Sequence, residues 1–293
     1  MTCSPFRYRI DLVRRLTYTE RRAVHGVTTL NNKIFVVYAE LPFIVVCMSD
    51  EPYTRLPNIA INGLKYPLDI AAGSSCLYVS DPGSCAIWRV KADDSEVEQW
   101  LSGLVAVSVS VTSEEKLVLL VAVDVQGSEE ERNLNNRGEI QIYSAGAVKE
   151  AVIQLSPDIT TPHCVVMTTR KTFIVSYGMD WHEMNRVCEV DMTGRTLKAF
   201  GSAPGEDVGQ LNTPCRVSLD DEERIIVADY RNDRALLLNK QLMLQRVLVT
   251  WHYPPRPDSN DAGGPFKLHY DRQSGRLLVG LFTGPLDIYQ LHD

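Results

Sequence analysis

Residues 211 to 244 read LNTPCRVSLDDEERIIVADYRNDRALLLNKQLML, and their pattern indicates the architecture of the whole chain. An apolar segment follows Pro214, an acidic turn leads to a second apolar segment that ends at Asp229, and a charged turn leads to a third. Asp and Asn suit such turns because their short side chains accept backbone N–H bonds and tolerate turn conformations. The stretch therefore predicts a sheet of short antiparallel strands joined by tight turns.

The same order of strand, turn and strand recurs along the chain. Units that begin with a proline dipeptide start at Tyr66, Thr161, Thr213 and Gly264, and two units without the proline start at Val24 and Leu104. Their spacing of about 40 to 60 residues suits four short strands per unit. Six units predict an all-β fold, a six-bladed β-propeller.

The two ends of the chain complement each other. After the strand PLDIYQLHD the sequence stops at Asp293, one strand short of a complete unit, whereas the N-terminal strand DLVRRLTYTE has no unit of its own. Pairing the two would close the ring and remove exposed sheet edges. We expect a tail over 1–9 and a single monomeric domain over 10–293. The expected blades are 20–62, 63–103, 104–158, 159–210, 211–262, and 263–293 together with 10–19.

The composition is that of a folded globular protein. Hydrophobic residues make up 44% of the 293 residues, and the net charge is −7, which argues against a broad basic face for nucleic acid. No segment approaches 18 apolar residues, and the first twenty residues lack a signal-peptide core, so we expect a cytoplasmic protein without membrane contact. Seven scattered cysteines predict reduced thiols, and Cys76 with Cys85 is the one disulfide pairing to consider.

The fifth unit resembles the NHL-repeat family, whose pattern joins an apolar residue and proline, a strand ending in V-x-D and an Asn-Arg turn. Five residues of this unit occupy the marked positions: Pro214, Val227, Asp229, Asn232 and Arg234. The third unit keeps Asp124, Asn136 and Arg137, and the fourth keeps Pro162, Asn185 and Arg186. The resemblance covers the chain after residue 10 at the level of the fold and is specific in units three to five.

This resemblance implies a recognition module. NHL propellers are most familiar as the substrate-binding or RNA-binding end of tripartite-motif ubiquitin ligases. The chain has no zinc-binding Cys/His set and no coiled-coil heptads, so ligase chemistry is not expected in these residues. Similar six-bladed folds also occur among gluconolactonase-like and paraoxonase-like hydrolases and an amidating lyase, which hold a metal in the central channel.

A metal site is therefore the enzyme alternative. Alignment of the first strands puts His25 and His163 at the same position, three blades apart, with Asp69 as an additional carboxylate. Two imidazoles fall short of the three protein ligands of a catalytic zinc site. The chain also lacks a GxSxG motif and a phosphate-binding glycine loop. We expect no cofactor and no catalysis, and a metal-dependent hydrolase or lactonase remains an alternative.

Several residues are candidates for a binding surface. Asp69 shares its register with Arg216 and Lys267, which predicts a salt-linked channel mouth suited to docking. The long loop of the third unit contributes Glu129, Glu130, Glu131 and Arg132, and later loops contribute Trp181, His182, Trp251 and His252. Exposed tryptophans would mark a protein contact, and buried ones would pack the blades.

RNA binding is the runner-up function. Arg7, Arg9, Arg14, Arg15, Arg21 and Arg22 cluster at the N-terminus, with Tyr8 and Tyr18 between them. Arginines with aromatic side chains suit phosphate contact and base stacking, but the same pattern is typical of a solvated outermost strand. Acidic loops also oppose a nucleic-acid ligand.

We assign the charged turn of the opening stretch to structure. Its charges recur in weakened form in the third and fourth units, and a hinge is expected in every blade whereas a catalytic cluster is expected once. Asp229 and Asn232 are predicted to shape the turn and Arg234 to pack or form an ion pair toward the neighbouring blade. The sequence thus favours a non-catalytic propeller that binds a protein through one loop face.

Overall fold

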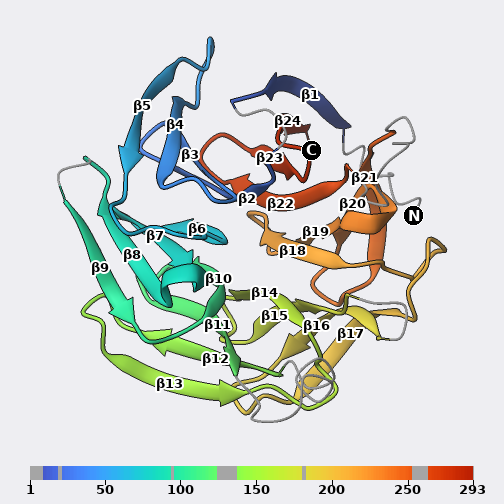
Figure 1. Cartoon of the computed structure of the whole chain (residues 1–293). Helices are drawn as coiled ribbons and strands as arrows, with labels where there is room; N and C mark the ends of the chain where they lie inside the picture. Colours follow the sequence, from blue (N-terminus) through green and yellow to red (C-terminus); the bar gives the residue numbers. More distant parts are fainter. Residues whose placement is uncertain are drawn as a thin grey trace.

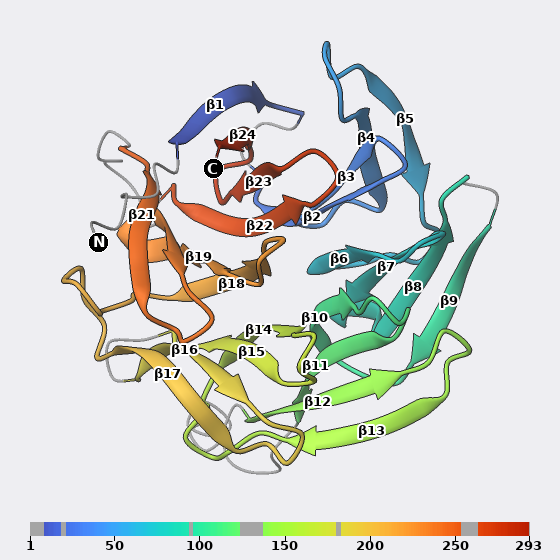
Figure 2. The ribbon, with the colours of Figure 1, turned by 180° about the vertical axis from the view of Figure 1, so that it is seen from behind.

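The computed structural model describes residues 9–18, 22–93, 96–123, 137–179, 183–252 and 263–292. Six four-stranded antiparallel sheets are arranged around a central axis (Figures 1 and 2). The predicted six-bladed β-propeller is confirmed. Within the described residues the helical content is two short 3-10 turns, η1 (Pro82–Ser84) and η2 (Tyr230–Asn232).

Each of the first three blades runs outward from the axis in chain order. The first contains β2 (Val24–Leu30), β3 (Lys33–Tyr38), β4 (Phe43–Met48) and β5 (Arg55–Ala60). The second contains β6 (Asp69–Ala72), β7 (Cys76–Asp81), β8 (Ala86–Lys91) and β9 (Val97–Ser102). The third contains β10 (Ala106–Val111), β11 (Leu117–Val123), β12 (Arg137–Tyr143) and β13 (Lys149–Gln154).

The remaining blades complete the ring. The fourth contains β14 (Pro162–Met167), β15 (Phe173–Tyr177), β16 (Asn185–Val190) and β17 (Thr196–Ser202). The fifth contains β18 (Pro214–Leu219), β19 (Ile225–Asp229), β20 (Arg234–Leu238) and β21 (Leu244–Thr250). The sixth contains β22 (Pro265–Asp271), β23 (Arg276–Leu281), β24 (Leu286–His292) and, outermost, β1 (Arg9–Leu16).

The N-terminal strand closes the ring, as predicted. β1 pairs antiparallel with β24, so that the first and last strands of the chain lie side by side in one blade (Figure 1). Arg15 on β1 donates from Nε and Nη2 to the two carboxylate oxygens of Asp287 on β24, at 2.6 and 2.7 Å. Because Asp287 is fully buried, this bidentate ion pair fixes the closing strand to the core of the sixth blade.

The hydrophobic core consists of layers between adjacent blades. Between the first and second blades, for example, Phe35 and Ile44 pack with Ile70 and Trp88. The middle strands of each blade are apolar on both faces because each face meets a neighbouring blade, as in FIVSY of β15, where every residue is buried. Removal of apolar surface from water stabilises these layers by roughly 25 cal/mol per Å².

The charged turn of the opening stretch connects neighbouring blades. The buried carboxylate of Asp229 accepts hydrogen bonds from the backbone N–H of Asn212, from Asn232 Nδ2 and from Arg234 Nε, at 2.7 to 2.8 Å. Arg234 also donates to the carbonyls of Glu206 and Gln210, in the segment between β17 and β18. The turn residues therefore tie the fifth blade to the segment that enters it, and the ion pair of Arg234, predicted toward the neighbouring blade, forms with Asp229 of its own blade.

The described cysteines are free thiols, Cys76 and Cys85 among them, so the pairing considered above does not form. Four of the six are buried in the apolar layers, and burial raises the pKa of Cys188 and of Cys215 to about 12. In the described part of the chain, no helix is long and apolar enough to cross a membrane.

Candidate functional site

Five of the six innermost strands carry a β-bulge near their first residue. The pairing of each innermost strand with its neighbour shifts at His25, Val107, His163, Cys215 and Phe266. A bulge inserts one unpaired residue and re-aims its side chain. His25 and His163 therefore occupy equivalent positions, as the aligned sequence indicates, and Val107 is the third-unit residue that alignment of the repeats does not identify.

The residues that follow the five bulges, and Asp69 at the first position of β6, form an inner ring around the axis. In chain order this inner ring consists of Gly26, Asp69, Ser108, Cys164, Arg216 and Lys267. Its polar members bond to the next blade: Asp69 accepts from Val109 N–H at 2.9 Å, and Ser108 accepts from Val165 N–H at 3.5 Å. Gly26 is required by space, because a Cβ would lie 2.8 Å from the backbone nitrogen of Ile70. The inner ring thus joins the blades around the axis.

An ion pair crosses the channel within this ring. Arg216 Nη1 in the fifth blade contacts Asp69 Oδ2 in the second blade, and it also donates to Ser108 Oγ at 3.3 Å. Burial disfavours the charged form of Arg216, but the carboxylate of Asp69 raises its pKa above the usual value. Asp69, Arg216 and Lys267 are 0, 7 and 5% exposed. They lie inside the channel instead of forming the docking surface expected from sequence.

The two histidines are held by backbone carbonyls. His25 donates from Nδ1 to Pro67 O at 2.9 Å, and His163 donates from Nε2 to Gly178 O at 3.2 Å. Burial and then Lys267 lower the pKa of His25 to about 4, and burial lowers that of His163 to about 4. Both rings are therefore neutral near pH 7. Within the described residues, no three His, Cys, Asp or Glu side chains converge on a point that could hold a metal ion.

Aromatic side chains of the first, second, fifth and sixth blades cluster near the bulges. The His25 ring contacts Tyr66 and Phe266, with centroids 5.3 and 5.8 Å apart, and Phe266 contacts Tyr230 and Phe282 at 5.7 and 5.3 Å. Tyr66 is 41% exposed. These rings form an aromatic cluster at this end of the channel.

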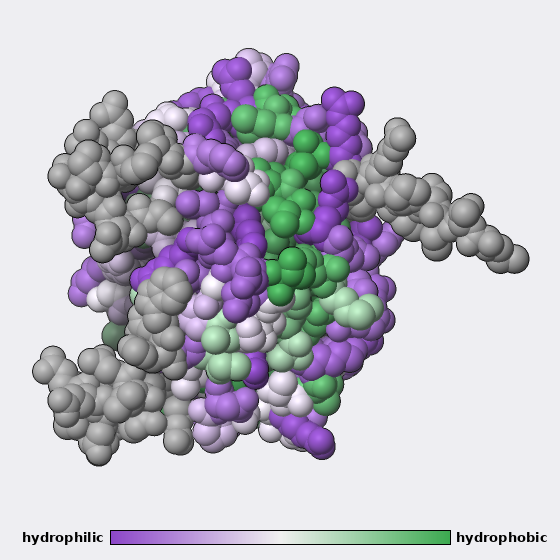
Figure 3. Space-filling view, turned by 90° about the vertical axis from the view of Figure 1, so that its right-hand side faces the viewer, coloured by the Kyte–Doolittle hydropathy of each residue, from purple (hydrophilic) through white to green (hydrophobic). Residues whose placement is uncertain are grey.

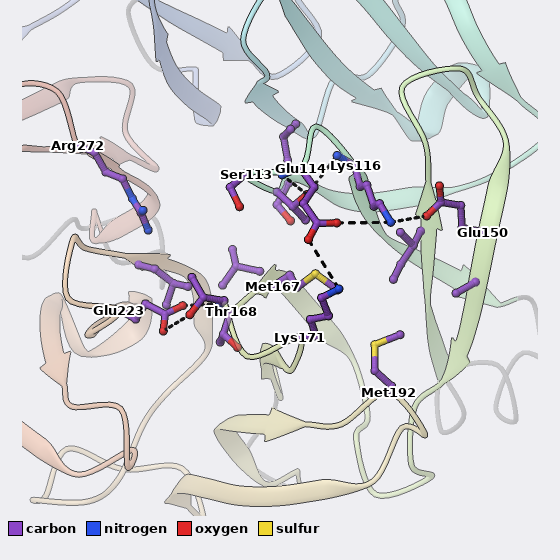
Figure 4. Close-up of a pocket in the computed structure, with 18 residues that line it drawn as sticks. Ser113, Glu114, Lys116, Glu150, Met167, Thr168, Lys171, Met192, Glu223 and Arg272 are labelled. Carbon is purple, nitrogen blue, oxygen red and sulfur yellow. Dashed lines mark hydrogen bonds and ion pairs between the residues drawn. The ribbon is translucent and has the colours of Figure 1, made fainter.

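The opposite face carries an open pocket of about 720 Å³ (Figure 4). Turns between the first and second strands of the third and fourth blades, 112–116 and 168–172, form its rim. Its apolar lining residues are Val111, Ile142, Ala151, Val166, Met167, Met192 and Leu219. Its volume lies in the range of pockets that hold small ligands or peptide side chains.

Charges of both signs line the rim of this pocket. Lys116 Nζ lies 2.8 Å from Glu150 and 3.6 Å from Glu114, and Lys171 Nζ lies 3.7 Å from Glu114. Figure 4 shows these groups at one end of the pocket and Arg272 with Glu223 at the other. Arg272 donates to the Asp220 carbonyl at 3.3 Å, and the described residues give it no carboxylate partner. Its guanidinium is the cation of the rim best placed to receive an external acid.

Two acidic turn residues align the turns of this face, and neither was among the candidates expected from sequence. Glu115 accepts from Ser74 N–H at 2.9 and 3.1 Å, and Glu223 accepts from Thr169 N–H at 2.6 Å. Both have positive φ and sit at the same place in their turns. In the sequence both residues lie in similar turn motifs, SEEK at 113–116 and DEER at 221–224, and this similarity was the one sign of their shared role. Such acidic motifs do not differ in composition from ordinary solvated turns.

The tryptophan-containing candidates divide into two groups. Trp251 is 6% exposed, donates to Asp287 Oδ2 at 3.1 Å and packs against Tyr289, so it serves blade packing instead of an exposed contact patch. His252 beside it is exposed. The candidates Glu129, Glu130, Glu131, Arg132, Trp181 and His182 lie outside the described residues.

The N-terminal arginines that suggested RNA are partly neutralised. Arg9 pairs with Asp11 at 2.9 Å, Arg15 pairs with Asp287, and Arg22 lies 3.3 Å from Glu40. Arg14 is exposed on β1, and Arg7 and Arg21 lie outside the described residues. An outermost strand with paired charges fits the edge-protecting alternative.

Hydrophobic residues also gather on the outer wall of the propeller. Figure 3 shows them as a band on the side that faces right in Figure 1, where β21 lies. On β21 (Leu244–Thr250), the apolar side chain of Val247 is 42% exposed. Such a band is a second surface on which a partner could dock.

Solved structures support the fold. A protein of unknown function from Bacteroides thetaiotaomicron is similar, with a TM-score of 0.68 and 13% identity over 97% of this chain and 76% of that one. A catalytically inactive variant of virginiamycin B lyase from Staphylococcus aureus with quinupristin has a TM-score of 0.62 and 11% identity over 97% of this chain and 100% of that one. A streptogramin B lyase structure has a TM-score of 0.61 and 8% identity over 97% and 98%.

No family model matches the sequence. The similarity to the NHL-repeat family therefore stands as a resemblance, and the solved structures establish the propeller architecture, which hosts many unrelated functions.

Proposed function

We propose that this propeller is a non-catalytic recognition module that binds a segment of another protein in the pocket between the third and fourth blades. The observation that carries the proposal is the pocket itself: an open space of about 720 Å³ with an apolar floor and a charged rim. Met167 and Met192 contribute to its lining, and methionine side chains adapt to differently shaped apolar ligands.

The charges of the rim favour an acidic peptide. Lys116 and Lys171 are already paired with Glu114 and Glu150, and Glu223 is bonded to the Thr169 turn. Arg272 remains as the cation without a carboxylate partner in the described part of the chain. A peptide with an apolar side chain next to an Asp or Glu would place the apolar group on the floor and the carboxylate at Arg272.

The alternatives receive less support from the described residues. A phosphate backbone would meet Glu114, Glu150 and Glu223 at this pocket. The lyase function of two similar structures is an analogy at the level of the fold, and the channel histidines here are bonded to carbonyls. A role as the substrate-recognition part of a ubiquitin ligase would be one setting for peptide binding and stays a prediction from resemblance.

Selection from a random peptide library displayed on phage tests the proposal, with affinities of enriched peptides then measured by calorimetry. We expect the enriched peptides to contain an apolar residue next to an acidic one. We expect Met167→Glu to abolish their binding. Val208→Glu is the matched control, because Val208 is 91% exposed in the 203–213 segment, which connects strands at the other end of the propeller.

Two results would contradict the proposal. Enriched peptides that bind Met167→Glu as well as wild type would place recognition elsewhere, and loss of binding in Val247→Glu would place it on the outer wall at β21. Capture from lysate with and without nuclease is the complementary measurement, since partners lost on nuclease treatment would favour the RNA alternative.

A further inference from the structure

Lys267 is a buried cation without an ion-pair partner among the described residues. It lies on β22 in the inner ring and is 5% exposed. The hydrogen bonds and ion pairs of the described residues do not include its ammonium, whose one described contact is the face of the Phe266 ring, 5.2 Å from the centroid. An ammonium has three donors, and Lys267 Nζ is not among the fully buried polar atoms without a partner, so it keeps some surface open to the channel. The local structure therefore leaves its donors available for an external acceptor.

The channel carboxylate does not serve as that acceptor. Asp69 Oδ1 accepts from Ile70 N–H at 2.9 Å, and Asp69 Oδ2 accepts from Val109 N–H at 2.9 Å and from Arg216. Two cations, Arg216 and Lys267, thus face one carboxylate in the inner ring. One positive charge of this ring remains uncompensated.

The uncompensated positive charge affects the pKa of Lys267 itself and of the nearby histidines. Burial is the largest cause that lowers the pKa of Lys267, and Arg216 lowers it further while Asp69 raises it. Lys267 in turn contributes to the lowered pKa of His25 and of His163, after burial. A negative charge near the ammonium would relieve these unfavourable interactions together.

We propose that the central channel binds one small monovalent anion, of halide or formate size, at the ammonium of Lys267. The aromatic cluster around Phe266 supplies a weakly hydrated wall, and Lys267 supplies the positively charged donors. The N–H groups of His25 and His163 are already donated to Pro67 and Gly178, which makes Lys267 the principal donor. The site lies in the channel interior, apart from the peptide pocket, and does not depend on the proposed function.

Chloride binding can be measured on the whole chain by ³⁵Cl NMR, in which exchange with a protein site broadens the chloride signal. We expect saturable broadening for wild type, complete loss of the saturable part in Lys267→Met and full retention in Lys240→Met, since Lys240 is an exposed lysine. Crystals soaked in sodium bromide should show an anomalous peak within hydrogen-bond reach of Lys267 Nζ. Competition by sodium formate would extend the ligand class to carboxylates, and absence of competition would restrict it to halides.

Folding of the variants is checked by thermal unfolding. Removal of an unpaired buried charge should leave the melting temperature of Lys267→Met in low-halide buffer equal to or above that of wild type. Lys267→Gln provides a second neutral variant if Lys267→Met does not fold. The proposal is overturned if wild type shows no saturable broadening, or if broadening persists in the folded neutral variant.

Discussion

Arg216 and Asp69 are 147 residues apart in the sequence and form an ion pair across the central channel, from the fifth blade to the second. The side chains are 9 and 1% exposed. The pair therefore links opposite sides of the ring in a region of low dielectric, where loss of one partner leaves an uncompensated charge.

Asp69→Asn should destabilise the protein by about 3 to 5 kcal/mol, because the Arg216 guanidinium would stay buried without its carboxylate. The free energy of unfolding from urea titration measures this loss. Glu96→Gln removes an exposed ion pair with Lys91 and should cause no measurable change. The double variant Asp69→Asn/Arg216→Met, which removes the unpaired charge and keeps an acceptor for a backbone N–H, should recover much of the loss. Equal stability of Asp69→Asn and wild type would contradict the role of the pair.

The stability of the protein should fall as the pH drops from about 6.5 to about 4 because of three histidines whose pKa values are lowered, the buried His25 and the half-buried His163 and His269. Burial lowers the pKa of His25, of His163 and of His269 to about 4, so over this window the unfolded chain binds protons that the folded chain does not. Each ring contributes up to about 3 kcal/mol of this loss.

His25→Gln tests the assignment while it retains a donor for the Pro67 carbonyl. The difference in unfolding free energy between wild type and His25→Gln should shrink, or reverse, as the pH falls through this window. The comparison between variants is needed because burial raises the pKa of Asp220 and of Asp229 to about 6, which gives the opposite slope. If the unfolding free energies of wild type and His25→Gln change in parallel with pH, His25 is not held neutral in the folded protein.

Arg15→Ala should loosen the strand that closes the ring. Arg15 is half exposed but its partner Asp287 is fully buried, so we expect a cost of about 1 to 2 kcal/mol. Hydrogen exchange of the β1 amides should accelerate while exchange in β18 stays slow. Arg9→Ala is the control, because the Arg9 pair with Asp11 is exposed. Unchanged exchange in β1 would mean that backbone pairing alone holds the closure.

Asp229→Ala should destabilise the protein by about 3 kcal/mol, since it removes the acceptor of three hydrogen bonds, one of them from Arg234. Thermal and urea unfolding measure the effect, with Glu222→Ala as an exposed acidic control in the same blade. Unchanged stability together with lost ligand binding would instead identify Asp229 as a binding residue.

Arg272→Gln should lower the affinity of the protein for an acidic peptide by about tenfold, which corresponds to roughly 1.4 kcal/mol. It should also reduce the salt dependence of binding. Calorimetry at two salt concentrations measures both. A peptide whose acidic residue is replaced by its amide should bind wild type and Arg272→Gln alike. A large difference between the two proteins for that neutral peptide would indicate that Arg272 acts through packing instead of charge.

The register of the inner ring was predictable because the proline and the strand length repeat. Asp69, Arg216 and Lys267 aligned in sequence, and the structure brings them to one level of the channel. Their burial was not predictable, since it depends on how closely six strands approach the axis. The equivalence of Val107 to His25 and His163 became visible only in the strand pairing, because a bulge changes the alternation of side chains without a signal in composition.

The six-bladed fold and its closure could be read from the sequence alone. Alternating apolar segments, polar turns and two complementary incomplete ends each constrain residues that are close in the chain or repeat at fixed spacing. The pairing of charges in the interior and the position of the pocket emerged with the tertiary structure. Closure of the ring brings Arg216 to Asp69 and places Met167 in one pocket with Arg272. These contacts depend on distances between blades, which no local pattern in the sequence encodes.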